Sequence, residues 1–249
     1  MSTSLGQLAV YSVLIVAGAL AGAAVPLRAP RTRLVTFLAF AAGVMFGAAF
    51  FHMLPEAYEG AGPKALSFVP AGFVFLFLIE RFVIAHVCEE PPDCAEHTHR
   101  RGGMGLAAFF GMSVHTLFDG VALGSSVVEG VGLTAFIAIL AHKVPSSLSL
   151  AALFKSEGRS APAVLWFAAL FGLLVPAGAV AYLGLAHLVT FERFSPVALA
   201  FSAGSFLYIA VSDLLPHVNR HGKDKRLANV ICLVGGLAVM LAISFVHHG

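Results

Sequence analysis

The chain has 249 residues, of which 59% are hydrophobic and only 11% are charged. A soluble domain carries about 25% charged residues, so this chain has too little polar surface to cover a globule in water. Its net charge of +2 does not indicate a nucleic-acid partner. These values predict an integral membrane protein.

Long apolar runs follow one another along the chain and predict a polytopic, all-α membrane protein. A helix of roughly 20 apolar residues crosses a bilayer, and the runs lack the short alternating segments of a membrane β-barrel. They account for most of residues 1–249, so we expect a single domain. The first run should be a retained helix, because no basic region precedes it. We expect eight helices, at residues 5–27, 34–58, 66–87, 104–128, 131–154, 161–189, 194–217 and 227–246.

Basic residues gather in alternate connections between these helices. The odd-numbered connections hold eleven Lys and Arg residues, whereas the even-numbered ones hold two. Positively charged loops stay in the cytoplasm, so we expect both termini to lie outside it. The third connection, residues 88–103, is then a cytoplasmic loop. Its candidate metal ligands are Cys88, Cys94, His97 and His99, although their spacing matches no closed zinc site and a solvated connector explains them equally well.

Two of the expected helices, 34–58 and 194–217, share a pattern at an offset of 161 residues. Ala42-Gly43 corresponds to Ala203-Gly204, and a Leu-Pro pair begins eleven residues after the glycine in each helix. Because the topology makes the two helices run in opposite directions, the match predicts an inverted repeat, which is typical of secondary transporters.

Each of these helices also carries two ionisable residues four positions apart, around its Leu-Pro pair. They are His52 with Glu56 and Asp213 with His217. We expect the first pair to bind a transported ion where it enters and the second pair to bind it where it leaves. Ordinary polar residues at the membrane interface would show the same pattern.

The middle of the fourth and fifth helices holds ionisable residues, which indicate function because each costs about 2.5–3.5 kcal/mol inside a membrane. His115 and Asp119 are four apart, so they share one helix face, and His142 lies on the next helix. Imidazole and carboxylate are zinc ligands, so we predict a metal centre, with Ser146 as a fourth candidate ligand. Pro145 would free a backbone carbonyl beside His142. The alternative is that these residues hydrogen-bond neighbouring helices.

The motif His115-x-x-x-Asp119-Gly120, followed by His142-x-x-Pro145, resembles the signature of the ZIP (Zrt/Irt-like) divalent-metal transporters. The resemblance covers essentially the whole chain, including the eight spans, the His-containing third loop and the Leu-Pro-Glu at the end of the second helix. It implies movement of a zinc-type cation toward the cytoplasm by alternating access. It also implies an elevator-type fold, in which helices one, four, five and six slide against the other four.

The sequence departs from many members of that family in ways that affect the number of metal ions. Thr116 stands where they have Asn, Lys143 where they have an acidic residue, and Val175 where they have Glu. The resemblance therefore implies the His-Lys-x-Pro branch, with a single metal position. We hypothesise that the Lys143 ammonium replaces the second cation. The alternative is a lysine that extends toward the membrane interface.

We therefore expect a transporter rather than an enzyme, with Zn²⁺ as the transported substrate and Fe²⁺, Mn²⁺ or Cd²⁺ as other candidates. Two alternatives stay open. One is a metal-sensing receptor, and the other is an intramembrane zinc hydrolase built from His115, Asp213, His217 and Ser146, although the chain has no H-E-x-x-H motif. The expected partners are the metal ion and membrane lipid, with a homodimer left open and no nucleic acid. We expect the bacterial inner (plasma) membrane as its location.

Overall fold

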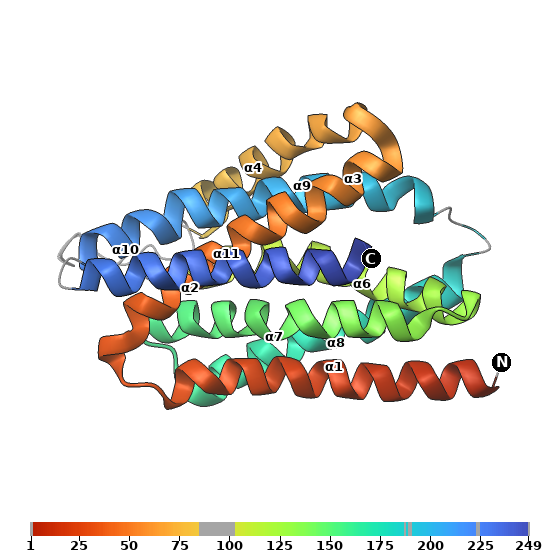
Figure 1. Cartoon of the computed structure of the whole chain (residues 1–249), viewed down its shortest axis with the longest axis horizontal. Coiled ribbons are helices and arrows are strands. Elements are labelled where there is room, and N and C mark those ends of the chain that lie inside the picture. Colours follow the sequence, from red (N-terminus) through yellow and green to blue (C-terminus); the bar gives the residue numbers. More distant parts are fainter. Residues whose placement is uncertain (1, 85–102, 187, 189–190, 223–224, 249) are drawn as a thin grey trace.

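The computed structural model describes residues 2–84, 103–186, 188, 191–222 and 225–248, and these residues form a bundle of helices without a strand (Figure 1). The apolar runs form helices because a backbone in lipid must satisfy its own hydrogen bonds. The main α-helices are α1 (Ser2–Arg28), α2 (Leu34–Ala48), α3 (Leu54–Ala61), α4 (Phe68–Leu78), α6 (Met104–Glu129), α7 (Gly132–Ser156), α8 (Ala161–Leu185), α9 (Phe191–Tyr208), α10 (Leu215–His221) and α11 (Arg226–His248).

Seven helical stretches in the described residues are long and apolar enough to cross a membrane. One of them, Leu34–Phe82, has 49 residues and contains α2, α3 and α4. This stretch reverses direction at Gly62, whose φ of 66° suits a residue without a side chain, and Figure 1 shows α3 and α4 running in opposite directions. Counted as two crossings, it gives the eight spans expected from the sequence.

A π-helical segment interrupts each of the two helices that share the repeated pattern. The segments are η2 (Ala49–Met53) and η6 (Ile209–Leu214), and a Leu-Pro pair follows each of them. Proline lacks an N–H and its ring clashes with the carbonyl four residues earlier, so the helix widens before it. The two matched helices run in opposite directions (Figure 1). The two helices thus share a π-helical segment before their Leu-Pro pairs as well as a sequence pattern. Their opposite directions are what an inverted repeat requires.

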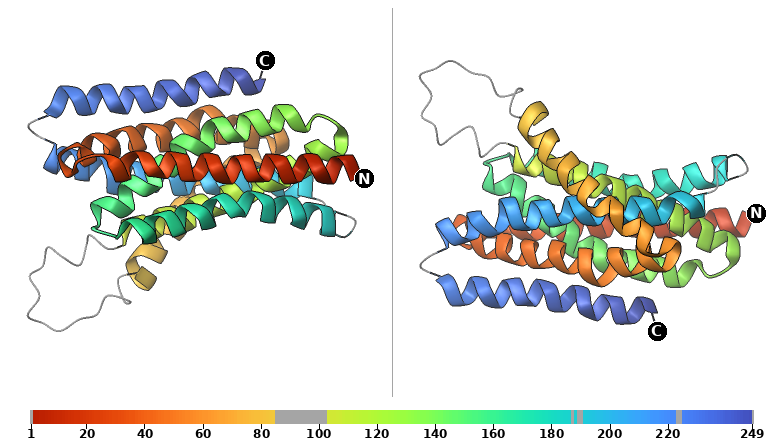
Figure 2. Two further views of the ribbon diagram at one scale, coloured as in Figure 1. Left: turned by 90° about the horizontal axis from the view of Figure 1, so that it is seen from below. Right: turned by 90° about the horizontal axis from the view of Figure 1, so that it is seen from above.

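The helices form two groups, each held together by close glycine contacts. In the first helix group (α1, α6, α7 and α8), a Cβ on Gly120 of α6 would collide with a backbone carbonyl of α8, and one on Gly22 of α1 with a carbonyl of α7. In the second helix group (α2, α3, α4, α9, α10 and α11), Gly43 of α2 meets α11 and Gly72 of α4 meets α9 in the same way. Small residues let helix backbones approach closely in membranes. Figure 2 shows α11 along one edge of the bundle.

Across the boundary between the two groups, the glycine contact involves side chains rather than backbone. Gly111 of α6 faces Leu76, Ser205 and Ile209 of the second helix group, and an added Cβ would lie 3.1–3.4 Å from their side-chain atoms. Among the glycines that the structure describes, no backbone collision crosses from one group to the other. The described glycines thus interlock helix backbones within each group, whereas the one glycine among them that faces the other group, Gly111, meets side chains.

The end of α7 joins three helices of the first group. The Lys155 ammonium donates hydrogen bonds to the carbonyls of Pro26, Leu27 and Ala29, at 2.8, 3.0 and 2.6 Å. These carbonyls lie at the C-terminus of α1, where the partial negative charge of a helix favours a cation. Glu157 accepts a 2.7 Å hydrogen bond from the backbone N–H of Gly105 at the start of α6. One end of the first helix group is therefore fixed by α7.

Candidate metal centre

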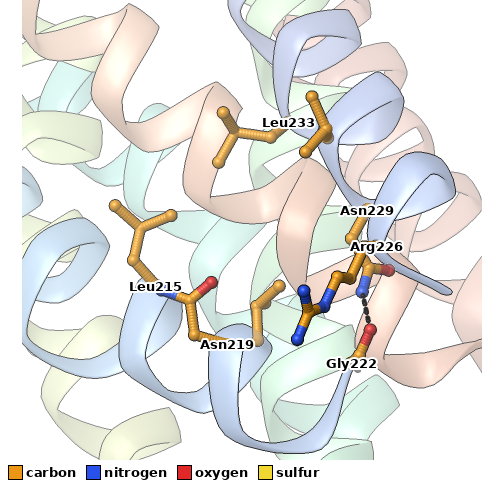
Figure 3. A pocket seen from close by; sticks show the side chains of 8 residues that line it. Leu215, Asn219, Gly222, Arg226, Asn229 and Leu233 are labelled. Carbon is orange, nitrogen blue, oxygen red and sulfur yellow. Dashed lines mark hydrogen bonds between the residues drawn. The ribbon is translucent and has the colours of Figure 1, made fainter. Parts of the chain in front are cut away.

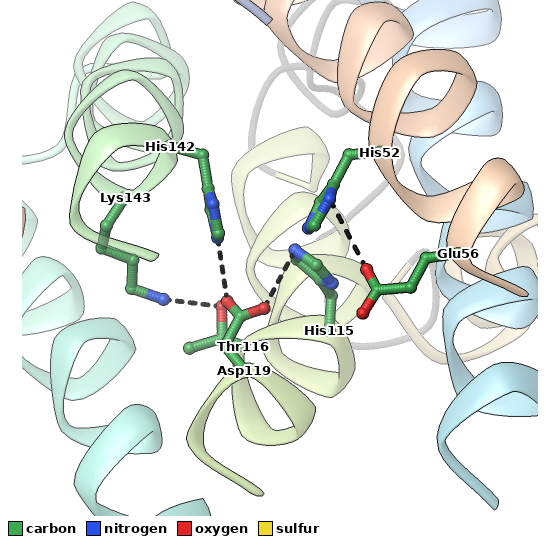
Figure 4. A network of polar contacts seen from close by, with 7 residues as sticks. All are labelled: His52, Glu56, His115, Thr116, Asp119, His142 and Lys143. Carbon is green, nitrogen blue, oxygen red and sulfur yellow. Dashed lines mark hydrogen bonds and ion pairs between the residues drawn. The ribbon is translucent and has the colours of Figure 1, made fainter. Parts of the chain in front are cut away.

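Four side chains that could bind a metal converge in the middle of the bundle (Figure 4). His115 and Asp119 come from α6, His142 from α7 and His52 from η2. One ligand atom from each lies within 4.8 Å of all the others. The four residues are only 4–7% exposed, so water does not reach them freely.

Asp119 is at the centre of this cluster and faces two imidazoles. Its Oδ1 lies 3.4 Å from Nε2 of His115, and its Oδ2 lies 3.2 Å from Nε2 of His142. In a tetrahedral zinc site with bonds of about 2.0–2.1 Å, neighbouring ligand atoms are separated by about 3.3–3.4 Å. Each separation is close to one edge of such a tetrahedron, although the two involve different oxygens of Asp119 and the contact with His142 is also a hydrogen bond.

His52 brings a third imidazole from the second helix group. Its ring centroid lies 5.7 Å from that of His115 and 5.2 Å from that of His142, and those two rings are 5.6 Å apart. Glu56 lies 3.5 Å from Nδ1 of His52. A carboxylate beside the second nitrogen of a histidine commonly orients the ring of a metal ligand. The centre thus draws its ligands from both helix groups.

The environment of His115 also fits a metal ligand. Its Nε2 faces Asp119, and its Nδ1 is buried without a hydrogen-bond partner among the described residues, a deficit that a bound water would remove. The ring of Phe206, from α9, packs edge-on against the imidazole at a centroid distance of 5.7 Å. The sequence did not point to Phe206, because an aromatic residue in an apolar helix carries no distinguishing signal.

Lys143 lies beside the cluster and is 1% exposed, so it does not extend to the membrane interface. Its Nζ donates a 2.8 Å hydrogen bond to Oγ1 of Thr116. The same ammonium lies 3.8 Å from the centre of the Phe171 ring, a cation–π contact. In Figure 4, Lys143 and the His52–Glu56 pair approach Asp119 from opposite sides.

The other candidate residues lie outside the four-residue cluster. Ser146 is buried on α7, one turn beyond His142. Asp213 is buried in η6, and the ring of His217 in α10 stacks on that of His221 at 4.4 Å. The candidate ligands Cys88, Cys94, His97 and His99 of the third connection fall outside the described residues.

A helical membrane bundle with a buried His₃Asp cluster defines a class of membrane proteins that handle metal ions. Comparison with known sequences then gives the family. The profile described as "ZIP Zinc transporter" matches residues 2–105 and 85–244, so the chain belongs to the ZIP family.

Several curated relatives are similar to this chain. A zinc transporter ZIP9 of Micropogonias undulatus is 31% identical over 197 residues, which cover 71% of this chain and 62% of that protein. A zinc transporter ZIP1 of Takifugu rubripes is 27% identical, in an alignment that covers 86% of each chain. An uncharacterized protein, MJ1036, of Methanocaldococcus jannaschii is 29% identical over 82% of this chain and 84% of its own length.

The match to the ZIP9 proteins spans less than two thirds of their length. The relatives with a stated role are named as transporters and not as enzymes. The hydrolase alternative therefore has no support from the family.

Proposed function

We propose that this protein transports a divalent cation, zinc in the first place, across a membrane toward the cytoplasm. The observation that carries the proposal is the buried cluster of His52, His115, Asp119 and His142, whose ligand atoms lie within 4.8 Å of one another. Nitrogen and carboxylate ligands suit zinc, and also Fe²⁺, Mn²⁺ or Cd²⁺. The ZIP family profile and the names of the relatives support the same conclusion.

Uptake into liposomes tests this function directly. Purified protein in vesicles that contain a zinc-sensitive dye should produce a signal when zinc is added outside. His115→Ala should reduce the rate to that of protein-free vesicles, because a buried ligand is lost from the site. Ser125→Ala is a matched control on the same helix, since its hydroxyl only bonds the carbonyl of Ala122. Zinc binding without flux would favour the metal-sensing receptor and overturn the transport proposal.

We further propose that the centre holds one ion because Lys143 takes the place of a second. Its ammonium is buried and bonded to Thr116, which stands where many family members carry a metal-binding Asn. Together with the carboxylate of Asp119 in the same site, its positive charge would leave the site near neutral before metal binds, which lowers the cost of moving it through lipid.

Lys143→Glu tests the number of ions. The variant should bind two zinc ions per chain by calorimetry or elemental analysis, where the parent protein binds one, and its uptake rate should fall. Lys143→Met removes the charge without adding a ligand, so this variant should still bind one ion. The ion should bind more weakly or exchange more slowly than in the parent protein. A Lys143→Glu variant with full rate and one ion per chain would contradict the surrogate role.

Alternating access would follow from movement of the first helix group against the second. The glycine contacts support this, because they interlock backbones within each group, whereas Gly111 meets only side chains across the boundary. The ion would enter past Glu56 to reach the cluster that contains His52, and it would leave past Asp213 and His217. Both termini would be extracytoplasmic, in a single membrane domain of the bacterial inner (plasma) membrane.

A further inference from the structure

A cavity of about 530 Å³ lies far from the metal centre, between α10 and the beginning of α11 (Figure 3). Both helices contribute apolar side chains to its wall, and polar groups gather at its end near Gly222. Val230, one of the lining residues, is 57% exposed, so the cavity opens to the surface of the bundle. It is lined by Leu215, Val218, Asn219, Gly222, Arg226, Asn229, Val230 and Leu233.

Arg226 gives this cavity a positive charge without a counterion among the described residues. It is the first residue of α11, and Figure 3 shows its guanidinium lying over the gap between the two helices. In the described part of the chain it forms no hydrogen bond or ion pair. A helix N-terminus carries partial positive charge and unsatisfied N–H groups, so acidic residues are favourable there. The first turn of α11 contains none. Arg226 is exposed, and an anion at this position would contact both its guanidinium and the N-terminus of α11.

The surroundings indicate what kind of anion fits. Next to the cavity, the outer face of α11 exposes large apolar side chains, with Leu227 at 74%, Ile231 at 60% and Val234 at 54%. Such a face in a membrane protein contacts lipid. The connection before α11 is basic: Arg220, Lys223, Lys225 and Arg226 outnumber the single acid Asp224. Basic pockets between membrane helices on the positively charged side bind anionic head groups.

We propose that this cavity binds an anionic phospholipid. The phosphate accepts hydrogen bonds from the Arg226 guanidinium, whose planar fork suits phosphate oxygens. One acyl chain lies against Leu215, Val218, Val230 and Leu233. The lipid joins α10 to α11 within the second helix group and is independent of the metal centre. A zwitterionic lipid fits less well because its amine brings a positive charge beside Arg226.

Native mass spectrometry of detergent-purified protein, titrated with phosphatidylglycerol or phosphatidylcholine, tests this site. The parent protein should retain one phosphatidylglycerol with about ten-fold preference over phosphatidylcholine, and Arg226→Gln should lose that preference. Arg220→Gln is the matched control, since this exposed arginine of the same basic connection does not line the cavity. Arg226→Lys should restore part of the binding.

Two further measurements support the test. One is a variant that changes the shape of the cavity without changing its charge, and the other is competition with inorganic phosphate. Asn219→Trp should narrow the cavity from an exposed position and weaken lipid binding without changing the charge. Inorganic phosphate at millimolar concentration should not displace the lipid. Equal retention of phosphatidylglycerol by the parent, Arg226→Gln and Asn219→Trp would overturn the proposal, and so would equal retention of the two lipids by the parent.

Discussion

At the scale of single residues, His52 is the candidate ligand whose position depends most on the tertiary structure. It belongs to a different helix group from His115, Asp119 and His142, yet it completes the cluster in which all ligand atoms lie within 4.8 Å. Glu56 follows one turn later and faces its other side, at 3.5 Å from Nδ1. An ion bound by all four proposed ligands would therefore link the two groups through the His52 imidazole.

This arrangement predicts unequal effects of two substitutions. His52→Ala should weaken zinc binding more than Glu56→Gln, because the first removes a ligand and the second removes only the group that orients it. Loss of such an orienting partner typically costs about 10–100-fold in metal affinity. Isothermal titration of the two purified variants gives the comparison. If Glu56→Gln were the more damaging change, Glu56 itself would be the ligand and His52 its support.

At the scale of secondary-structure elements, the junction of α7 with α6 contains a carboxyl group that titrates near neutrality. Burial raises the pKa of Glu157 from 4.5 to about 7, against the opposing effects of the hydrogen bond from Gly105 and of Arg159. Because the pKa is higher in the folded protein than in the unfolded chain, the folded state is favoured while this carboxyl is protonated. Its contribution is complete below about pH 4.5 and is lost as the pH rises to about 7.

Glu157→Gln should therefore flatten part of the pH dependence of stability. The parent protein should lose up to about 3 kcal/mol from this group between pH 4.5 and 7.5, whereas the amide, which can still accept the bond from Gly105, cannot titrate. Thermal unfolding in detergent at several pH values measures the difference. Parallel curves for the two proteins would show that Glu157 is not the titrating group.

At the scale of the whole molecule, the boundary between the two helix groups offers a way to test their relative movement. A Cβ on Gly111 would lie 3.4 Å from Cβ of Ser205 across that boundary, and one on Gly172 would lie 3.2 Å from Cβ of Ala19 within the first helix group. Both separations are close to the roughly 3.5–4.5 Å found between the Cβ atoms of a disulfide. The two pairs therefore form a matched set of cross-links.

In a background without the natural cysteines, oxidation of Gly111→Cys/Ser205→Cys should abolish zinc uptake, and a reductant should restore it. The Gly172→Cys/Ala19→Cys disulfide should leave uptake within about two-fold of the reduced protein, because both residues move together. Liposome flux before and after reduction measures both. Undiminished transport through the oxidised boundary pair would exclude sliding of one group against the other.

The eight spans and the shared helix face of His115 and Asp119 could be predicted from the sequence, because they depend on local properties. Apolar runs must form helices in lipid, and residues four apart must share a helix face, whatever surrounds them. His115 and Asp119 follow from this rule alone. Helix ends were less predictable: the helix expected at 66–87 begins as a short 3₁₀ segment at Gly62, and α8 ends at Leu185, four residues early.

Only the tertiary structure decided which distant residues meet. The spacing of His52 and Glu56 indicated a ligand pair, but the position of His52 beside His142 depends on the π-helical turn before Pro55 and on the packing of α2 against α7. Lys143 also depends on the tertiary structure. Its place in the sequence allowed either a buried or an interfacial ammonium, and the fold places it inside the bundle, where it bonds Thr116. Contacts between segments far apart in the chain depend on how whole helices pack, and a single sequence carries little local signal of that packing.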